Sequence, residues 1–231
     1  MELPSMEDLI TLRREQPQDP LCSCCATTSL EVPLLIVGTM MENTSVRLLV
    51  ILSSVRMELR NGIPDSLEEF IDEINAEFMR VTTVPLETKF LAQLDKHTSK
   101  LLEVIRSKGG RVKEQTKATL QVLDETVDIT IRRECIFKSL MIYLGEPVHH
   151  LIKEDMQENE DTMAIVSGTE DIQIFIDGTE VLREVPTIVT AVAMFFGLTY
   201  ALNIKYPKKL QYTLEFVQRV LMELGGKKMS P

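Results

Sequence analysis

An apolar run from Ile188 to Ile204 constrains the fold of this chain more than any other feature. The run contains no charged residue. A helix that is apolar on almost every side has no face for solvent, so it has to be buried. Either a protein core or a membrane must therefore surround this segment.

A β-hairpin is predicted immediately before this run. Isoleucines at every second position from Ile172 to Ile176 give the period-two pattern of a strand. Asp177-Gly178 suits a type I′ turn, because both central residues of that turn need a positive φ. Val181 then begins the return strand, and Met163 to Val166 is expected to add an edge strand.

An amphipathic helix is predicted after the apolar run, from Lys209 to Leu224. It places five apolar residues on one face, at helical spacing. This face is the candidate interaction surface, and it consists of Leu210, Leu214, Val217, Leu221 and Leu224. The apolar run and this helix, with the hairpin, form the predicted C-terminal unit, residues 171–231.

The N-terminal third is predicted to contain a leader and a partial domain. Residues 1–43 combine prolines with polar residues and are interpreted as disordered. Residues 44–84 give two strand-like segments, Val46 to Leu52 and Val55 to Leu59, followed by a helix from Leu67. This order matches a partial ubiquitin-like ββα unit, for which Val81 to Val84 offers one further strand.

Residues 85–154 are predicted to form a small helical bundle. The first helix carries a stripe of apolar residues, namely Phe90, Leu94, Leu101 and Ile105. A second helix is expected from Val112 to Val127 and a third from a cap at Asp128 to Gly145. Pro147 suits the start of a short fourth helix that reaches Lys153.

An acidic connector, residues 155–170, joins the bundle to the C-terminal unit. From Glu146 to Glu184 there are eleven acids and two bases, a net charge of −9 in a chain whose net charge is −10. Such a segment repels nucleic acid, since binding requires that Lys and Arg neutralise phosphates. The apolar content of 44% suits a globular protein, so the expected fold class is α+β, mostly α.

The sequence contains no recognisable catalytic motif, and we predict no catalytic, metal-binding or cofactor-binding residue. Cys22, Cys24 and Cys25 lack a nearby fourth ligand for a zinc ion. His97 falls on the apolar stripe of the first bundle helix and is interpreted as a helix-face residue. The cysteine spacing is not that of a disulfide framework, which favours an intracellular protein, cytoplasmic or nuclear.

The run from Leu198 to Val220 resembles the C-terminal region of fish proteins catalogued as sterile alpha motif domain-containing protein 3-like. The similarity extends to Ile174-Phe-Ile-Asp-Gly178, and Val55 to Phe78 is similar to the ubiquitin-like unit of longer members. Together these segments cover about 80% of the chain and leave residues 1–43 outside. No sterile alpha motif is present in this sequence. The resemblance implies a fold and no reaction, and the shortened units suggest a truncated or mobile-element-derived product.

The function expected from these observations is that of a non-enzymatic protein-interaction or scaffold module with an unknown protein partner. Helix docking through the candidate face, or strand addition near Val46 to Leu59, would provide the contact. One alternative is a single-pass or membrane-associated protein that uses Ile188 to Ile204. Another is a nucleic-acid-associated factor, supported by a basic face that consists of Arg106, Lys108, Arg111, Lys113 and Lys117.

Overall fold

The computed structural model describes residues 67–154, 163–168, 171–176 and 178–224, which all belong to one unit of the chain, Glu42–Pro231. Helices predominate in this part and a four-stranded sheet accompanies them, so the predicted α+β, mostly α class is confirmed. The predicted leader and the strands between Val46 and Leu59 lie outside the described residues, as do residues 155–162 and 169–170 of the acidic connector.

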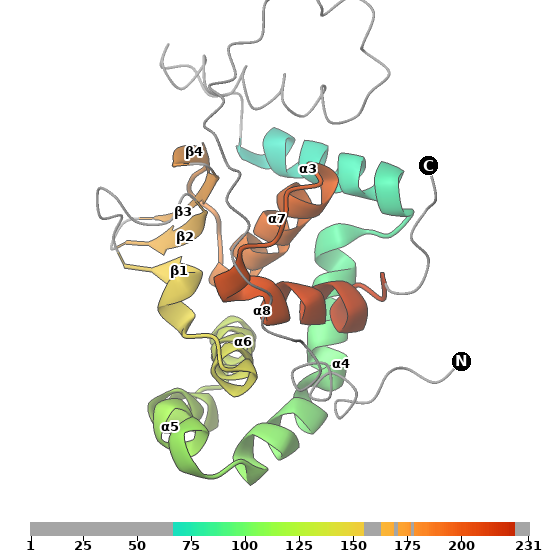
Figure 1. The fold of residues 1–231 in the computed structure, drawn as a ribbon. Coiled ribbons are helices and arrows are strands. Elements are labelled where there is room, and N and C mark those ends of the chain that lie inside the picture. Colours follow the sequence, from blue (N-terminus) through green and yellow to red (C-terminus); the bar gives the residue numbers. More distant parts are fainter. Residues whose placement is uncertain (1–66, 155–162, 169–170, 177, 225–231) are drawn as a thin grey trace, which may run out of the picture. The chain divides into compact units, whose positions relative to one another are not determined.

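Helix α7, Ile188–Ala201, occupies the centre of this unit, with α3 and α4 along it and the sheet on another side (Figure 1). Thirteen of its fourteen residues are buried. Thr187 caps the helix, since its hydroxyl oxygen accepts a hydrogen bond from the backbone N–H of Thr190 at 3.0 Å. The apolar run is thus enclosed by protein. None of the described helices has the combination of length and apolarity that crossing a membrane would require.

Helices α3, Leu67–Thr82, and α4, Leu86–Ser107, pack on α7. The ring of Phe78 on α3 meets that of Phe196 on α7 edge-on, with centroids 6.0 Å apart. A side chain at Gly197 would start 2.3 Å from Cδ2 of Leu86. The glycine therefore allows α4 to approach α7 closely, a role that its place in an apolar run did not reveal.

The predicted apolar stripe on α4 is confirmed, because Phe90, Leu94, Leu101 and Ile105 are all buried. The strand offered by Val81 to Val84 is wrong. Helix α3 continues through Thr82, whose hydroxyl donates to the carbonyl oxygen of Phe78 at 2.7 Å. Thr83, at a φ of 61°, then turns the chain toward α4.

Helices α5, Gly110–Glu125, and α6, Ile129–Leu144, form an antiparallel pair joined by three residues. The predicted cap at Asp128 is confirmed, since its carboxylate accepts from the N–H of Thr130 at 2.7 Å. Gly145, at a φ of 82°, ends α6 as expected. The predicted fourth helix is wrong, because only a 3₁₀ turn, η2, Val148–His150, forms before the chain enters strand β1, Ile152–Lys153.

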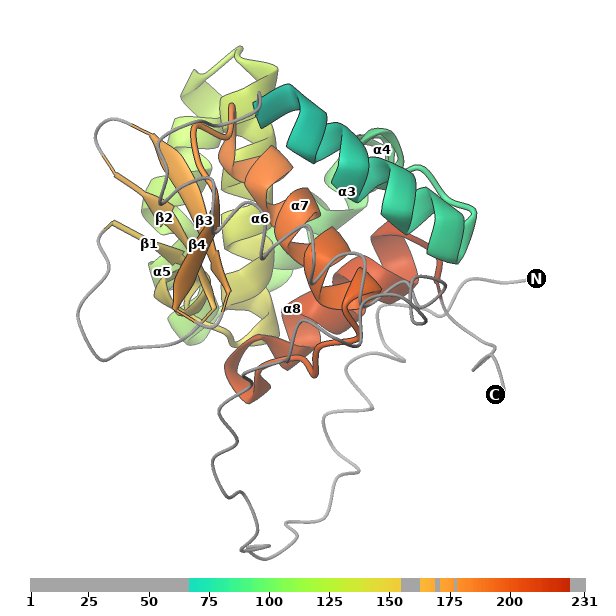
Figure 2. The ribbon, with the colours of Figure 1, turned by 90° about the horizontal axis from the view of Figure 1, so that it is seen from above.

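The sheet contains β1, β2 (Ala164–Ser167), β3 (Ile172–Ile176) and β4 (Thr179–Leu182), in that order. Strands β3 and β4 form the predicted antiparallel hairpin, and Gly178 has the positive φ, 69°, that its turn requires. Strand β2 confirms the predicted strand near Met163 to Val166, but β1 lies outside it in parallel. Figure 2 shows the sheet on one side of α6 and α7.

The C-terminal segment is not the single helix predicted from Lys209 to Leu224. It consists of a 3₁₀ turn, η3, Lys208–Leu210, the short helix α8, Gln211–Phe216, and a π-helical turn, η4, Val217–Leu221. It packs across α4 and α6. Val217 and Leu221 of the predicted face are buried in the π turn, and Met222, which follows it, is buried as well.

Candidate functional site

The candidate interaction face lies on the C-terminal segment and is mostly buried. Leu210, Leu214, Val217 and Leu221 are at most 1% exposed, and Leu224 is half-buried. These side chains cover α4 and α6, because those helices present apolar surface that needs a cover. The face predicted for docking is therefore occupied within the chain and offers no free surface in this structure.

A buried carboxylate fastens this segment to α6. Glu146 follows the end of α6, and its two side-chain oxygens accept from the backbone N–H groups of Tyr212 and Thr213 at 2.8 and 2.9 Å. Burial raises the pKa of Glu146, although these donors and nearby His150 act in the opposite direction. The sequence shows Glu146 only as the first acid of an acidic stretch, so nothing local signals this contact.

A second polar contact lies at the other end of the segment. Lys89 on α4 forms an ion pair with Glu223, which follows η4, and this hydrogen bond lowers the pKa of Glu223. Tyr206 donates its hydroxyl hydrogen to Oε1 of Gln218 at 3.0 Å. The Lys89–Glu223 pair thus ties the end of the C-terminal segment to α4. The Tyr206–Gln218 bond ties η4 to the chain just before η3.

Within the described ranges, no group of three or more His, Cys, Asp or Glu residues could hold a metal ion. Burial, followed by the charge of Lys96, lowers the pKa of His97 on α4. Burial raises the pKa of the Cys135 thiol, which disfavours the reactive thiolate. Cys22, Cys24 and Cys25 lie outside the described residues.

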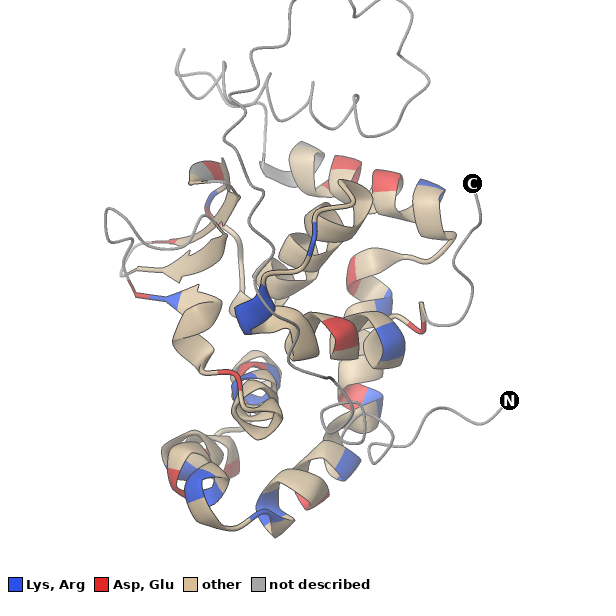
Figure 3. Cartoon of the chain, in the orientation of Figure 1, with Lys and Arg blue, Asp and Glu red and all other residues tan. Residues whose placement is uncertain are grey.

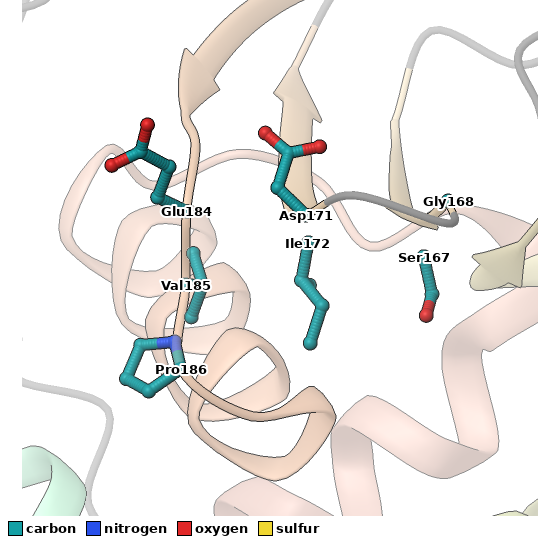
Figure 4. Close-up of a pocket in the computed structure, with 7 residues that line it drawn as sticks. All are labelled: Ser167, Gly168, Asp171, Ile172, Glu184, Val185 and Pro186. Carbon is teal, nitrogen blue, oxygen red and sulfur yellow. The ribbon is translucent and has the colours of Figure 1, made fainter.

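A recess of about 400 Å³ lies at the end of the sheet, where β2 ends and β3 begins. Ile172, Val185 and Pro186 provide its apolar part. The carboxylates of Asp171 and Glu184 point to the same side, away from these groups (Figure 4). The Asp171 carboxylate already accepts from the side-chain amide of Gln173 at 3.2 Å. Two neighbouring acids of this kind do not define a reaction.

The predicted basic face is present on the surface around the turn between α4 and α5, where Figure 3 shows several Lys and Arg residues. Arg106 forms an ion pair with Asp124 at 2.5 Å, and Lys108 lies 5.7 Å from the ring centroid of Tyr143. The remaining members, Arg111, Lys113 and Lys117, are exposed. The structure therefore leaves four of these charges around the α4–α5 turn, whereas Arg106 is paired with Asp124 in the last turn of α5.

An exposed apolar group, which we call the α5–α6 tip, lies at the opposite end of α5. It consists of Val122, Val127, Ile129 and Ile131, which are 47, 98, 52 and 41% exposed. Sequence reasoning missed it, because it included Val127 in the second helix and Ile129 in the apolar pattern of the third. The available signal was Val127 and Ile129, one on each side of the capping Asp128, within a short link.

Comparisons with models of protein families, with curated proteins and with solved structures found no match. The resemblance to the sterile alpha motif domain-containing protein 3-like family therefore stays a prediction. The surfaces described above are the basis on which a function can be proposed.

Proposed function

We propose that this protein is a non-enzymatic protein-interaction module whose docking surface is the α5–α6 tip. The observation that carries the proposal is the exposure of Val127, 98%, beside three further exposed apolar side chains. In the described part of the chain, the other exposed large apolar residues are Met79 and Val81, at 42 and 37%. Exposed apolar side chains are therefore concentrated at one place, as interaction surfaces require.

Burial of these side chains against a partner supplies the driving force. Removing one Val or Ile from water contributes about 1.5–3 kcal/mol when burial is complete. Asp124, Glu125 and Asp128 lie next to the tip in the sequence. Two bases accompany them, because Arg106 pairs with Asp124 and Arg132 donates to the backbone oxygen of Thr126. This border of mixed charge contains more acids than bases, which favours a partner with some basic residues around its own apolar contact.

The membrane alternative has less support than docking. Its basis was the apolar run from Ile188. That run forms α7, and thirteen of the fourteen residues of α7 are buried within the protein. The nucleic-acid alternative keeps the basic corner at the α4–α5 turn as its support. An intracellular location is part of the proposal, and the free, buried thiol of Cys135 is consistent with a reducing compartment.

Affinity capture from cell extract tests the proposal. We expect Val127→Asp with Ile129→Asp to remove partners that the unchanged protein retains, because a charged group cannot be buried against an apolar contact. Val81→Asp, at an exposed apolar position on α3, is the matched control and should retain them. Equal capture by all three proteins would contradict docking through the tip.

A further inference from the structure

Among the described α-helices whose residues can all be compared, α5 has the smallest share of buried residues. Only Thr116 and Leu123 among its sixteen residues are buried. Its outer face presents a stripe at intervals of three and four residues, and every member of it is exposed. The stripe consists of Arg111, Glu114, Ala118, Val122 and Glu125. Such spacing is the pattern by which one helix packs along another.

Charge is divided between the two ends of α5. The N-terminal part carries Arg111, Lys113 and Lys117 with Glu114 as its one acid, and Lys108 comes just before it. The C-terminal end carries Asp124 and Glu125, and Asp128 follows. Asp124 is already paired with Arg106 of the same chain, so Glu125 is the acid of α5 that remains for a partner. At a rise of about 1.5 Å per residue, the basic and acidic ends are about 20 Å apart. One copy of the helix is therefore complementary to a second copy that runs in the opposite direction.

The stripe gives this antiparallel arrangement a register. Arg111 and Glu125 are both seven residues from Ala118, which is two helical turns, so a two-fold axis at Ala118 places Arg111 of each copy opposite Glu125 of the other. The small, exposed side chain of Ala118 allows the two helices to approach. Val122 is then opposite Glu114, where the aliphatic part of that side chain can cover it.

The same axis brings the tip of one copy to the α4–α5 turn of the other. That turn contains Gly109 and Gly110, where an added Cβ atom would meet no atom within 4 Å. The turn is thus open and free of side chains at these positions, with Lys108 and Arg111 on either side. It is suited to receive Val127, whose side chain is almost fully exposed and lies between Glu125 and Asp128 in the sequence.

We propose that two copies of this chain associate through antiparallel α5 helices, so that the α5–α6 tip of each copy docks on the basic α4–α5 turn of the other. The inference rests on the proposed function in one respect, since it uses the tip as the docking surface. It names the partner as a second copy. Exposed ion pairs contribute little each, so the charges set the register and the apolar contacts add affinity.

Sedimentation equilibrium of the purified full chain, over a range of protein and salt concentrations, tests this proposal. The unchanged protein should form dimers that weaken as salt rises. Arg111→Glu alone, or Glu125→Arg alone, should raise the dissociation constant about tenfold, because each puts two like-charged pairs in the interface. The double variant restores opposite charges and should regain dimerisation. Lys208→Glu, an equal charge change at an exposed residue on η3, should have no effect.

Unfolding of α5 would not explain a loss of dimers in these variants. An acid near the N-terminus of a helix and a base near its C-terminus are both favourable to the helix dipole. Each single change should therefore maintain or increase the helical circular dichroism signal of the monomer. Rescue by the double variant is a result that a merely structural role of either residue would not produce.

Three results would overturn the self-association. The first is a monomer at every concentration, and the second is a dimer that ignores the single changes or is not restored by the double change. The third is a monomer that binds a labelled oligonucleotide at low salt and loses it with Arg111→Glu, which would assign the basic turn to nucleic acid. If the chain is monomeric but capture still depends on Val127 and Ile129, the proposed function stands with another partner.

Discussion

Helices α7 and α5 are of similar length, fourteen and sixteen residues, yet they have opposite relations to solvent. All but one residue of α7 is buried, whereas α5 buries only Thr116 and Leu123. The first helix is surrounded by α3, α4, α6 and the sheet, and the second is held mainly by α6. The difference teaches that the fold depends on α7, while α5 is available for contacts outside the chain.

The largest effect should come from α7. Phe196→Ala removes a fully buried ring that contacts Phe78 and Tyr200, and we expect it to lower the free energy of unfolding by about 3–5 kcal/mol. Chemical denaturation followed by circular dichroism measures this change. A loss below about 1 kcal/mol would mean that the centre of the unit tolerates a cavity, and the contrast with α5 would fail.

Within α5, a single residue should behave like α7. Leu123→Ala, at a side chain that is 1% exposed, should cost about 2–4 kcal/mol. Its neighbour Val122 is 47% exposed, so Val122→Ala should change the free energy of unfolding by less than about 0.5 kcal/mol. The pair can be compared in the same denaturation experiment. Similar losses at both positions, at a protein concentration where the chain is monomeric, would show that the chain itself covers the outer face of α5.

The same contrast should hold for polar contacts, with smaller effects. Glu146→Ala leaves the part-buried N–H of Tyr212 and the buried N–H of Thr213 without their acceptor, and should cost about 1–3 kcal/mol. Asp124→Ala on α5 removes the exposed ion pair with Arg106 on α4 and should cost less than about 1 kcal/mol. An equal loss of stability in both variants would contradict the assignment of Glu146 as a buried contact that holds the C-terminal segment.

The pH dependence of Glu146 gives this prediction a second measurement. Because burial raises the pKa of Glu146 in the folded chain, the folded chain binds a proton there more tightly than the unfolded chain does. The stability contributed by this proton is fully present below the ordinary pKa of a glutamate. That contribution is lost as the pH rises through the raised pKa. Glu146→Gln cannot ionise, so it should remove this part of the decline. Denaturation at several pH values above 4.5, the ordinary value, compares the two proteins.

The local elements of this protein were largely predictable because their signals are local. The alternation from Ile172 to Ile176 with Asp177-Gly178 predicted a hairpin, and Asp128 and Gly145 marked the two ends of α6. The failures have a common cause. Val81 to Val84 and Pro147 to Lys153 are short segments in which neighbouring structure outweighs local preference. The division of the C-terminal segment into 3₁₀, α and π turns depends on the surfaces of α4 and α6.

The sequence by itself determined that the segment beginning at Ile188 must be buried, since a helix without polar faces is unstable in water. It also determined which apolar stripes on α4 and on the C-terminal segment would seek cover. Only the tertiary structure decided which of those stripes cover one another. The face from Leu210 to Leu221 became part of the core, and Val127 was left in solvent. Burial is a property of the assembled neighbours, and apolar character alone does not show which side chains will find them.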